Sequence, residues 1–202
     1  MNKKIQDIIS ESIALKNTVL QDSSLLKTVE NIVQIIVAAL KKGKHIYFCG
    51  NGGSAADAQH LAAEFSGRFY LDRDALPAEA LHCNTSYLTA VANDYSYDVV
   101  YSRLLRGLAH EGDILVGLST SGNSINIVKA FETAREKNVS TIGFTGEGGG
   151  KMKDLSDYLV AIPSKTTPRI QEVHMLLGHI ICQLVEELYF ASVSPKEGIK
   201  TL

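Results

Sequence analysis

A histidine and a glutamate, His60 and Glu64, stand four residues apart in the alanine-rich segment NGGSAADAQHLAAEF. Residues four apart lie on the same face of a helix, so both side chains project in one direction. Their neighbours are too small to shield them from each other. Histidine nitrogens and carboxylate oxygens bind divalent metals, and the same groups can take and return protons. A helix built only for packing does not need such a pair.

The last helical segment, RIQEVHMLLGHIICQLVEE, carries further polar groups, because Gln171, His174 and His179 interrupt or border its apolar stripe. Taken singly, such a histidine is more often a core or boundary residue than a ligand. A divalent metal such as zinc is one possibility for the set His60, Glu64, Gln171 and His179, although glutamine is an uncommon zinc ligand. Acid–base catalysis needs only a carboxylate base, Glu64, and an imidazole partner, His179.

A first loop suited to an anion is CGNGGSA, which follows the apolar run HIYFC. Gly50, Gly52 and Gly53 let the backbone turn tightly and approach a ligand closely. Asn51 and Ser54 add polar side chains at the start of the following helix, whose free N–H groups favour an anion. The string GNGGSA therefore indicates a ligand-binding turn.

A second such loop, LSTSGNS, places four hydroxyls around a glycine just before the helical segment SINIVKAFETAREK. One helix cap explains one hydroxyl, and four exceed what capping needs. The loop contains no lysine or arginine, so hydrogen bonds and the helix dipole would have to hold an anion. We therefore predict a neutral phosphate cradle made by Ser119, Thr120, Ser121 and Ser124.

The string GNGGSA also fits the dinucleotide fingerprint G-x-G-x-x-A, with Asp72 at a suitable distance for a ribose contact. In that fold the acidic residue ends the second strand, whereas Asp72 precedes Pro77 and the apolar run AEALH. The Walker phosphate-binding pattern is absent from the sequence. A nicotinamide enzyme is therefore a weak alternative.

Short apolar runs alternate with segments of helical length from Lys44 onward, which is typical of a parallel sheet with helices on both faces. Such sheets bind ligands outside the carboxyl ends of their strands, where both predicted loops lie. The sequence thus predicts an α/β fold. We expect each strand to be buried on both faces. The expected strands are residues 45–49, 78–82, 113–119, 140–145 and 158–163, and the last helix runs from Pro168 to about Phe190.

Residues 1–43 read as two helices, the second ended by Gly43. They carry more apolar surface than a lone helical hairpin can hide. We expect one domain over residues 1–202, with the pair 1–43 at a subunit interface. The interfacial stripe is predicted to be Ile5, Ile8, Ile9 and Ile13.

The composition is that of an ordinary globular protein, with 45% hydrophobic and 21% charged residues and a net charge of −2. No basic cluster extends beyond Lys41–Lys44, which argues against nucleic acid as the primary ligand. Three widely separated cysteines indicate a reducing, cytoplasmic compartment. We see no signal peptide and expect no segment approaching the ~20 apolar residues that span a bilayer.

Four motifs in order resemble the phosphoheptose isomerases of the sugar-isomerase (SIS) domain superfamily: CGNGGSAADAQHLAAEFSGRF, NTSYLTAVANDY, GLSTSGNSINIVKA and TPRIQEVHMLLGHIICQLVE. The resemblance covers nearly the whole chain. It implies a three-layer α-β-α sandwich with a five-stranded parallel sheet, a flavodoxin-like SIS domain, plus two N-terminal helices. It further implies a homotetramer, and from the composition we expect it to be cytoplasmic and to bind neither nucleic acid nor a membrane.

The resemblance implies isomerisation of sedoheptulose 7-phosphate to D-glycero-D-manno-heptose 7-phosphate through an enediol. That step begins synthesis of the heptose in bacterial surface polysaccharide such as lipopolysaccharide. By the resemblance, Glu64 is the general base and His179 its partner. Zinc, one per subunit, would be held by His60, Glu64, Gln171 and His179. Substrate contacts carried over are Asn51, Gly52, Gly53, Ser54, Glu64, Arg68, Asn93, Asp94, Ser119, Thr120, Ser121, Ser124 and Gln171.

The sequence departs from the family pattern at two places. It has the stretch 82–86, HCNTS, where a Thr-Asp-Thr-Ser stretch is expected, and Ala92 where a glycine is usual. Both bear on the shape of the sugar pocket and the preferred stereochemistry. The rival hypothesis is a non-catalytic SIS module that senses a sugar phosphate or docks onto a partner such as a replication initiator. It would need the serine-rich loop but not Glu64 together with His179.

Overall fold

The computed structural model describes residues 1–191 and is built on a sheet of five parallel strands. The strands lie in the order β2-β1-β3-β4-β5, so the direction in which successive strands are added reverses between β1 and β3. In open α/β sheets, ligands bind in the crevice at this point. The strands are β1 (Ile46–Gly50), β2 (Ala78–Ala80), β3 (Ile114–Ser119), β4 (Ser140–Thr145) and β5 (Tyr158–Ala161).

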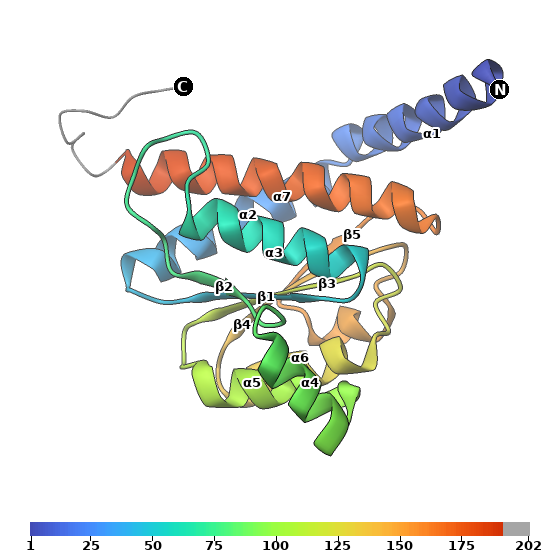
Figure 1. Ribbon diagram of the computed structural model, residues 1–202. Helices are drawn as coiled ribbons and strands as arrows, with labels where there is room; N and C mark the ends of the chain where they lie inside the picture. Colours follow the sequence, from blue (N-terminus) through green and yellow to red (C-terminus); the bar gives the residue numbers. More distant parts are fainter. Residues whose placement is uncertain (192–202) are drawn as a thin grey trace.

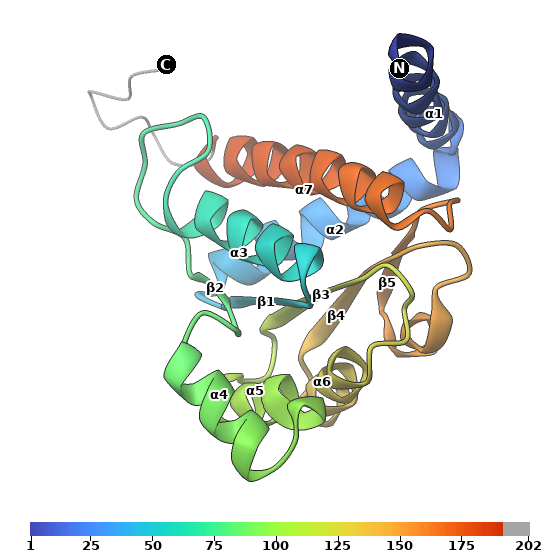
Figure 2. The ribbon, with the colours of Figure 1, turned by 45° about the vertical axis from the view of Figure 1, so that its right-hand side comes forward.

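Helices cover both faces of the sheet, which confirms the three-layer α-β-α prediction (Figures 1 and 2). Each face closes over its own hydrophobic cluster. On one face lie α2 (Ser23–Lys41), α3 (Gly53–Ser66) and α7 (Thr167–Phe190). On the other lie α4 (Thr85–Asp94), α5 (Val100–Leu108) and α6 (Ile125–Glu136). The 3₁₀ helices η1 (Tyr97–Val99) and η2 (Gly150–Leu155) complete the connections.

The strands match the predicted ones closely in the centre of the sheet and less closely at its edges. β1 and β3 are buried along their whole length. The edge strands β2 and β5 are only partly buried, and both end two residues before the prediction. An edge strand pairs on one side only, so fewer of its residues are held in the ladder. The expectation that every strand is buried on both faces was therefore wrong for β2 and β5.

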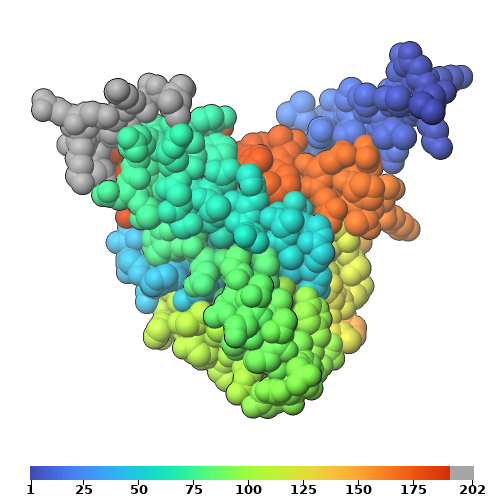
Figure 3. Space-filling model, viewed as in Figure 1, coloured from blue at the N-terminus to red at the C-terminus, as the bar shows by residue number. Residues whose placement is uncertain are grey.

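Helix α1 (Asn2–Gln21) stands away from the body of the molecule, as Figure 3 shows for the blue N-terminal segment. Asp22 separates it from α2 and caps α2 by accepting a hydrogen bond from the Leu25 backbone N–H. The predicted apolar stripe is exposed in this single chain: Ile5 51%, Ile8 43%, Ile9 53% and Ile13 53%.

Helix α2 is long and apolar enough to cross a membrane by length and composition, so the expectation that no segment approaches that length needs correction. Among the described residues it is the one such helix. Most of its apolar side chains, including Ile32 and Ile36, are buried in the core beneath α7, whereas Leu26 is exposed. The helix therefore presents one apolar face to the core of this fold.

Candidate functional site

The two predicted anion loops lie next to each other because β1 and β3 pair in the sheet. A reciprocal amide pair joins them: Asn51 Nδ2 donates to Asn126 Oδ1, and Asn126 Nδ2 donates to Asn51 Oδ1, both at 2.9 Å. The Tyr97 hydroxyl donates to Asn51 Oδ1 at 3.1 Å. The Asn51 side chain is thus largely engaged by protein groups and fixes the spacing of the two loops.

The hydroxyls of the serine-rich loop gather at the start of α6. Ser119 Oγ lies 3.0 Å from Ser124 Oγ and 3.5 Å from Ser121 Oγ. Ser124 is the N-cap of α6 but its hydroxyl caps no backbone N–H. Clustered hydroxyls beside free helix N–H groups can hold a phosphate without a cationic side chain. The geometry is therefore that of a neutral anion cradle.

The turn of this loop is fixed by Gly122, which has a φ of +65°. A Cβ at this position would collide with the backbone carbonyl of Gly149, which belongs to a glycine-rich segment behind the loop. The Met152 backbone N–H donates to the Gly122 carbonyl at 3.0 Å. Segment 146–152 therefore backs the cradle and holds it in shape.

The glycine loop leads directly into α3, and Gly52 takes a φ of +56°. Gln171 of α7 lies against this turn, where its Nε2 donates to the buried Ser54 Oγ at 3.3 Å. Predicted substrate contacts Asn51, Gly52, Ser54 and Gln171 thus lie together at the carboxyl edge of β1.

Three of the four predicted metal-ligating residues converge between α3 and α7. His60 Nε2 lies 3.0 Å from Glu64 Oε1 and 3.0 Å from His179 Nε2. The three ligand atoms all lie within 4.8 Å of one another. The structure thus brings together the carboxylate and imidazole that the sequence placed on separate helices.

This donor set fits zinc. Two imidazole nitrogens on one tetrahedral zinc lie about 3.3 Å apart, close to the observed His60–His179 separation. The two facing nitrogens cannot both carry a proton, so at least one offers a lone pair toward the other. His60 is exposed and Glu64 half-buried, which leaves the group open to solvent and to ligands.

Gln171 does not belong to this group within one chain. It precedes His179 by eight residues, which is about 12 Å along α7, and it contacts Ser54 instead. Similarly, His60 lies about 10 Å along α3 from Gly53. His60, Glu64 and His179, called here the acid–base group, therefore lie apart from the glycine loop within a single chain.

Three further predicted residues, Arg68, Asn93 and Asp94, are exposed at the ends of helices, whereas Thr120 is half-buried. Arg68 follows the C-terminus of α3. Asn93 and Asp94 end α4, where Asn93 Nδ2 donates to Asp94 Oδ1 at 2.9 Å. They precede Tyr97, which reaches Asn51, so this segment approaches the glycine loop through Tyr97.

Sequence reasoning missed several polar residues around the glycine loop, among them Asn126, Asp57 and His82. Asn126 was detectable as a polar residue between two isoleucines in the first turn of α6. Burial raises the pKa of Asp57 despite the opposing charge of His60, and Asp57 Oδ2 has no hydrogen-bond partner among the described residues. Burial lowers the pKa of His82. From the sequence alone, His82 was noted only as part of a stretch that departs from the family pattern.

Comparisons with a family model and with individual known proteins point to the same family. The SIS domain family model matches residues 7–146. The chain is 48% identical over 190 residues to the phosphoheptose isomerase of Clostridium acetobutylicum, covering 94% of this chain and 97% of that protein. It is 50% identical over 190 residues to the phosphoheptose isomerase of Aneurinibacillus thermoaerophilus, covering 94% and 96%.

Solved structures agree. The phosphoheptose isomerase from Neisseria gonorrhoeae superposes with a TM-score of 0.85 at 39% identity, covering 92% of this chain and 98% of that one. The phosphoheptose isomerase from Francisella tularensis superposes with a TM-score of 0.88 at 31% identity, covering 92% of this chain and 97% of that one. Family model, sequence identity and backbone shape all coincide over nearly the whole chain. The chain therefore belongs to the phosphoheptose isomerase family of SIS-domain proteins and is an isomerase.

Proposed function

We propose that the protein converts sedoheptulose 7-phosphate to D-glycero-D-manno-heptose 7-phosphate. The observation that carries this proposal is the convergence of Glu64 with His60 and His179, since a purely ligand-sensing SIS module would not need it. The hydroxyl cradle of the serine-rich loop supports a phosphorylated substrate. The names of the close relatives support a heptose.

The reaction moves a carbonyl from C2 to C1. Glu64 takes a proton from C1, the electron pair of that C–H bond forms the C1–C2 double bond, and the C2 carbonyl oxygen takes up a proton to give an enediol. A proton returned to C2 and loss of the proton from the C1 hydroxyl complete the aldose. His179 serves the oxygens or returns the proton, and each such group typically contributes ~10²–10⁴-fold to the rate.

We further propose that zinc binds at this group, held by His60, Glu64 and His179. Three protein ligands are the number typical of catalytic zinc sites. When bound there, zinc would polarise a carbonyl oxygen of the substrate. Gln171, the fourth residue expected as a ligand, instead supports substrate at the glycine loop within its own chain.

The assembled form is proposed to be a homotetramer. The exposed stripe of α1 would be buried between subunits. Because the acid–base group and the glycine loop lie apart along α3 and α7 within one chain, assembly would bring the acid–base group of one copy to the anion loops of another. We place the enzyme in the cytoplasm, where its product would supply heptose for surface polysaccharide such as lipopolysaccharide.

Glu64→Gln tests the proposal, because glutamine keeps the shape of the side chain and cannot accept the C1 proton as a base. We expect kcat for sedoheptulose 7-phosphate to fall at least 10²-fold. The dissociation constant of inorganic phosphate should stay unchanged, and calorimetric titration with Zn²⁺ should show weaker binding. Glu132→Gln, on the exposed surface of α6, is the matched control. Undiminished exchange of the C1 proton with solvent in Glu64→Gln would remove Glu64 from the mechanism.

A further inference from the structure

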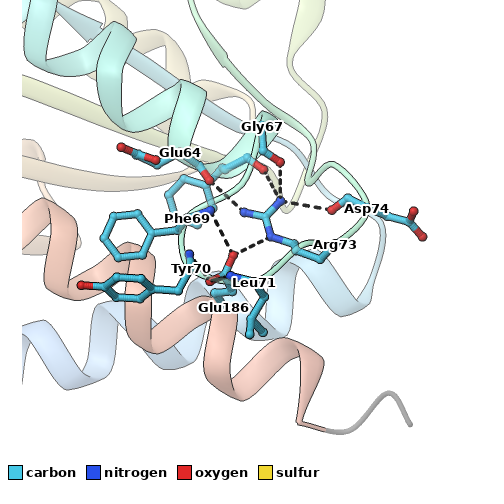
Figure 4. A network of polar contacts seen from close by, with 9 residues as sticks. Glu64, Gly67, Phe69, Tyr70, Leu71, Arg73, Asp74 and Glu186 are labelled. Atoms are coloured by element: carbon cyan, nitrogen blue, oxygen red, sulfur yellow. Dashed lines mark hydrogen bonds and ion pairs between the residues drawn. The ribbon is translucent and has the colours of Figure 1, made fainter. Parts of the chain in front are cut away.

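A buried ion pair lies at the end of α3 opposite the glycine loop. Arg73, in the connection between α3 and β2, donates from Nε to Glu186 Oε1 of α7 at 2.8 Å (Figure 4). Each side chain is only 2% exposed. Neither residue contacts the phosphate cradle, and the proposed chemistry does not use either of them directly.

Glu186 holds the connecting segment onto α7. Its carboxylate accepts hydrogen bonds from the backbone N–H groups of Phe69 at 3.2 Å, Tyr70 at 2.7 Å and Leu71 at 2.9 Å. Burial by itself would raise the pKa of Glu186. The N–H groups of Leu71 and Tyr70, followed by Arg73 and the Phe69 N–H, outweigh burial and lower it. Glu186 is therefore charged and fully engaged.

Arg73 holds the end of α3. Its Nη2 donates to the Glu64 carbonyl at 2.8 Å, and its Nη1 donates to the carbonyls of Phe65 at 2.7 Å and Gly67 at 3.0 Å. The last carbonyls of a helix lack intrahelical partners and need such a donor. The guanidinium therefore fixes the backbone of the turn that carries Glu64, as Figure 4 shows.

The same network reaches the imidazole side of the acid–base group. Glu186 follows His179 by two helical turns on α7. Phe69, whose backbone N–H is bound by Glu186, places its ring 5.8 Å from the His179 ring. One ion pair thus joins the turn bearing Glu64 to the helix bearing His179.

A buried ion pair is a weak source of net stability, because removing two charges from water offsets most of their attraction. A well-packed apolar pair could join α3 to α7 at no loss of stability. An apolar pair could not bind four backbone carbonyls and three N–H groups in fixed directions, as Arg73 and Glu186 do. The arrangement therefore serves orientation more than stability.

We propose that the Arg73–Glu186 pair positions Glu64 relative to His179 for the isomerase reaction. This role rests on the proposed acid–base function of those two residues. Arg73 and Glu186 touch no substrate and act through the backbone of α3 and the ring of Phe69.

Arg73→Lys is the main test, since lysine keeps the charge beside Glu186 but loses the fork that binds the α3 carbonyls. A displacement of reacting groups by about 1 Å can cost about 10²-fold, so we expect kcat to fall by up to that factor. KM and the dissociation constant of inorganic phosphate should stay within about two-fold, because the glycine loop and the neighbouring cradle lie beyond the opposite end of α3. The histidine ring resonances of His60 and His179 should shift in NMR spectra.

Two further variants make the result decisive. Glu186→Gln keeps the shape of the side chain and should lower kcat in the same direction, which gives a second reading if Arg73→Lys folds poorly. Arg106→Lys, in the exposed ion pair with Glu136, is the matched control and should behave as the parent protein. Rates are compared per folded molecule, with folding checked by circular dichroism below the melting transition.

The outcomes separate this inference from the function on which it rests. If Glu64→Gln is inactive while Arg73→Lys and Glu186→Gln keep the parent kcat and the parent resonances of His60 and His179, the positioning role is refuted alone. If Glu64→Gln retains turnover, the acid–base function itself fails. A fall in kcat with KM and phosphate binding preserved supports the inference.

Discussion

The burial of His174 predicts that the folded protein loses stability in acid, and this loss can be measured without any substrate. It lies on the buried face of α7 with 0% exposure, and its ring packs edge-on against Phe144 at 5.5 Å. Its Nε2 lies 3.0 Å from the Thr145 carbonyl, which can only accept, so Nε2 carries the proton. Nδ1 has no partner among the described residues. The native state therefore holds this ring neutral.

Burial lowers the pKa of His174 to about 4, against the weaker opposing effect of the Thr145 carbonyl. The unfolded chain takes up the proton near pH 6.5, whereas the folded chain resists it. The contribution of the neutral His174 ring to the free energy of unfolding is therefore fully present above pH 6.5. It declines as the pH falls toward 4. At about 1.4 kcal/mol for each tenfold change in proton affinity, the full loss is about 3 kcal/mol, a large part of the ~5–15 kcal/mol typical of a domain.

Urea unfolding at several pH values between 7.5 and 4.5 measures this loss. Glutamine at position 174 keeps an N–H donor and cannot be protonated in this range, so His174→Gln should flatten the profile. The exposed His110 offers a matched control, and His110→Gln should leave the slope as in the parent protein. Equal slopes for His174→Gln and the parent between pH 6.5 and 5 would refute the assignment.

Two further predictions concern the cradle and the first helix. Gly122→Ala should raise KM for the sugar phosphate at least tenfold and weaken inorganic phosphate binding in calorimetry, because Gly122 has φ +65° and no room for a Cβ. In contrast, Gly107→Ala, which meets no neighbour, should bind phosphate as the parent does. Ile9→Glu should dissociate the assembly in sedimentation velocity at micromolar concentration, because it charges the exposed stripe of α1. A parent protein already monomeric there would show that the stripe is not an interface.

The local pattern of the sequence determined the layered fold and the two anion loops. Apolar runs of strand length separated by helical segments fix a parallel sheet, because such strands must be covered on both faces. The glycines and hydroxyls lie directly after β1 and β3, so strand pairing brings them together without further information. The edge strands were less predictable, since where pairing stops depends on the neighbour and not on the strand itself.

Only the tertiary structure decided which polar residues meet. His60, Glu64 and His179 converge because α3 and α7 pack side by side in one register, which places Gln171 at Ser54 instead of with the other three. The Asn51–Asn126 brace and the Arg73–Glu186 pair join residues 75 and 113 positions apart. Local periodicity does not predict such long-range contacts. They depend on how the helices pack on the sheet, which sets the directions and distances between side chains far apart in the sequence.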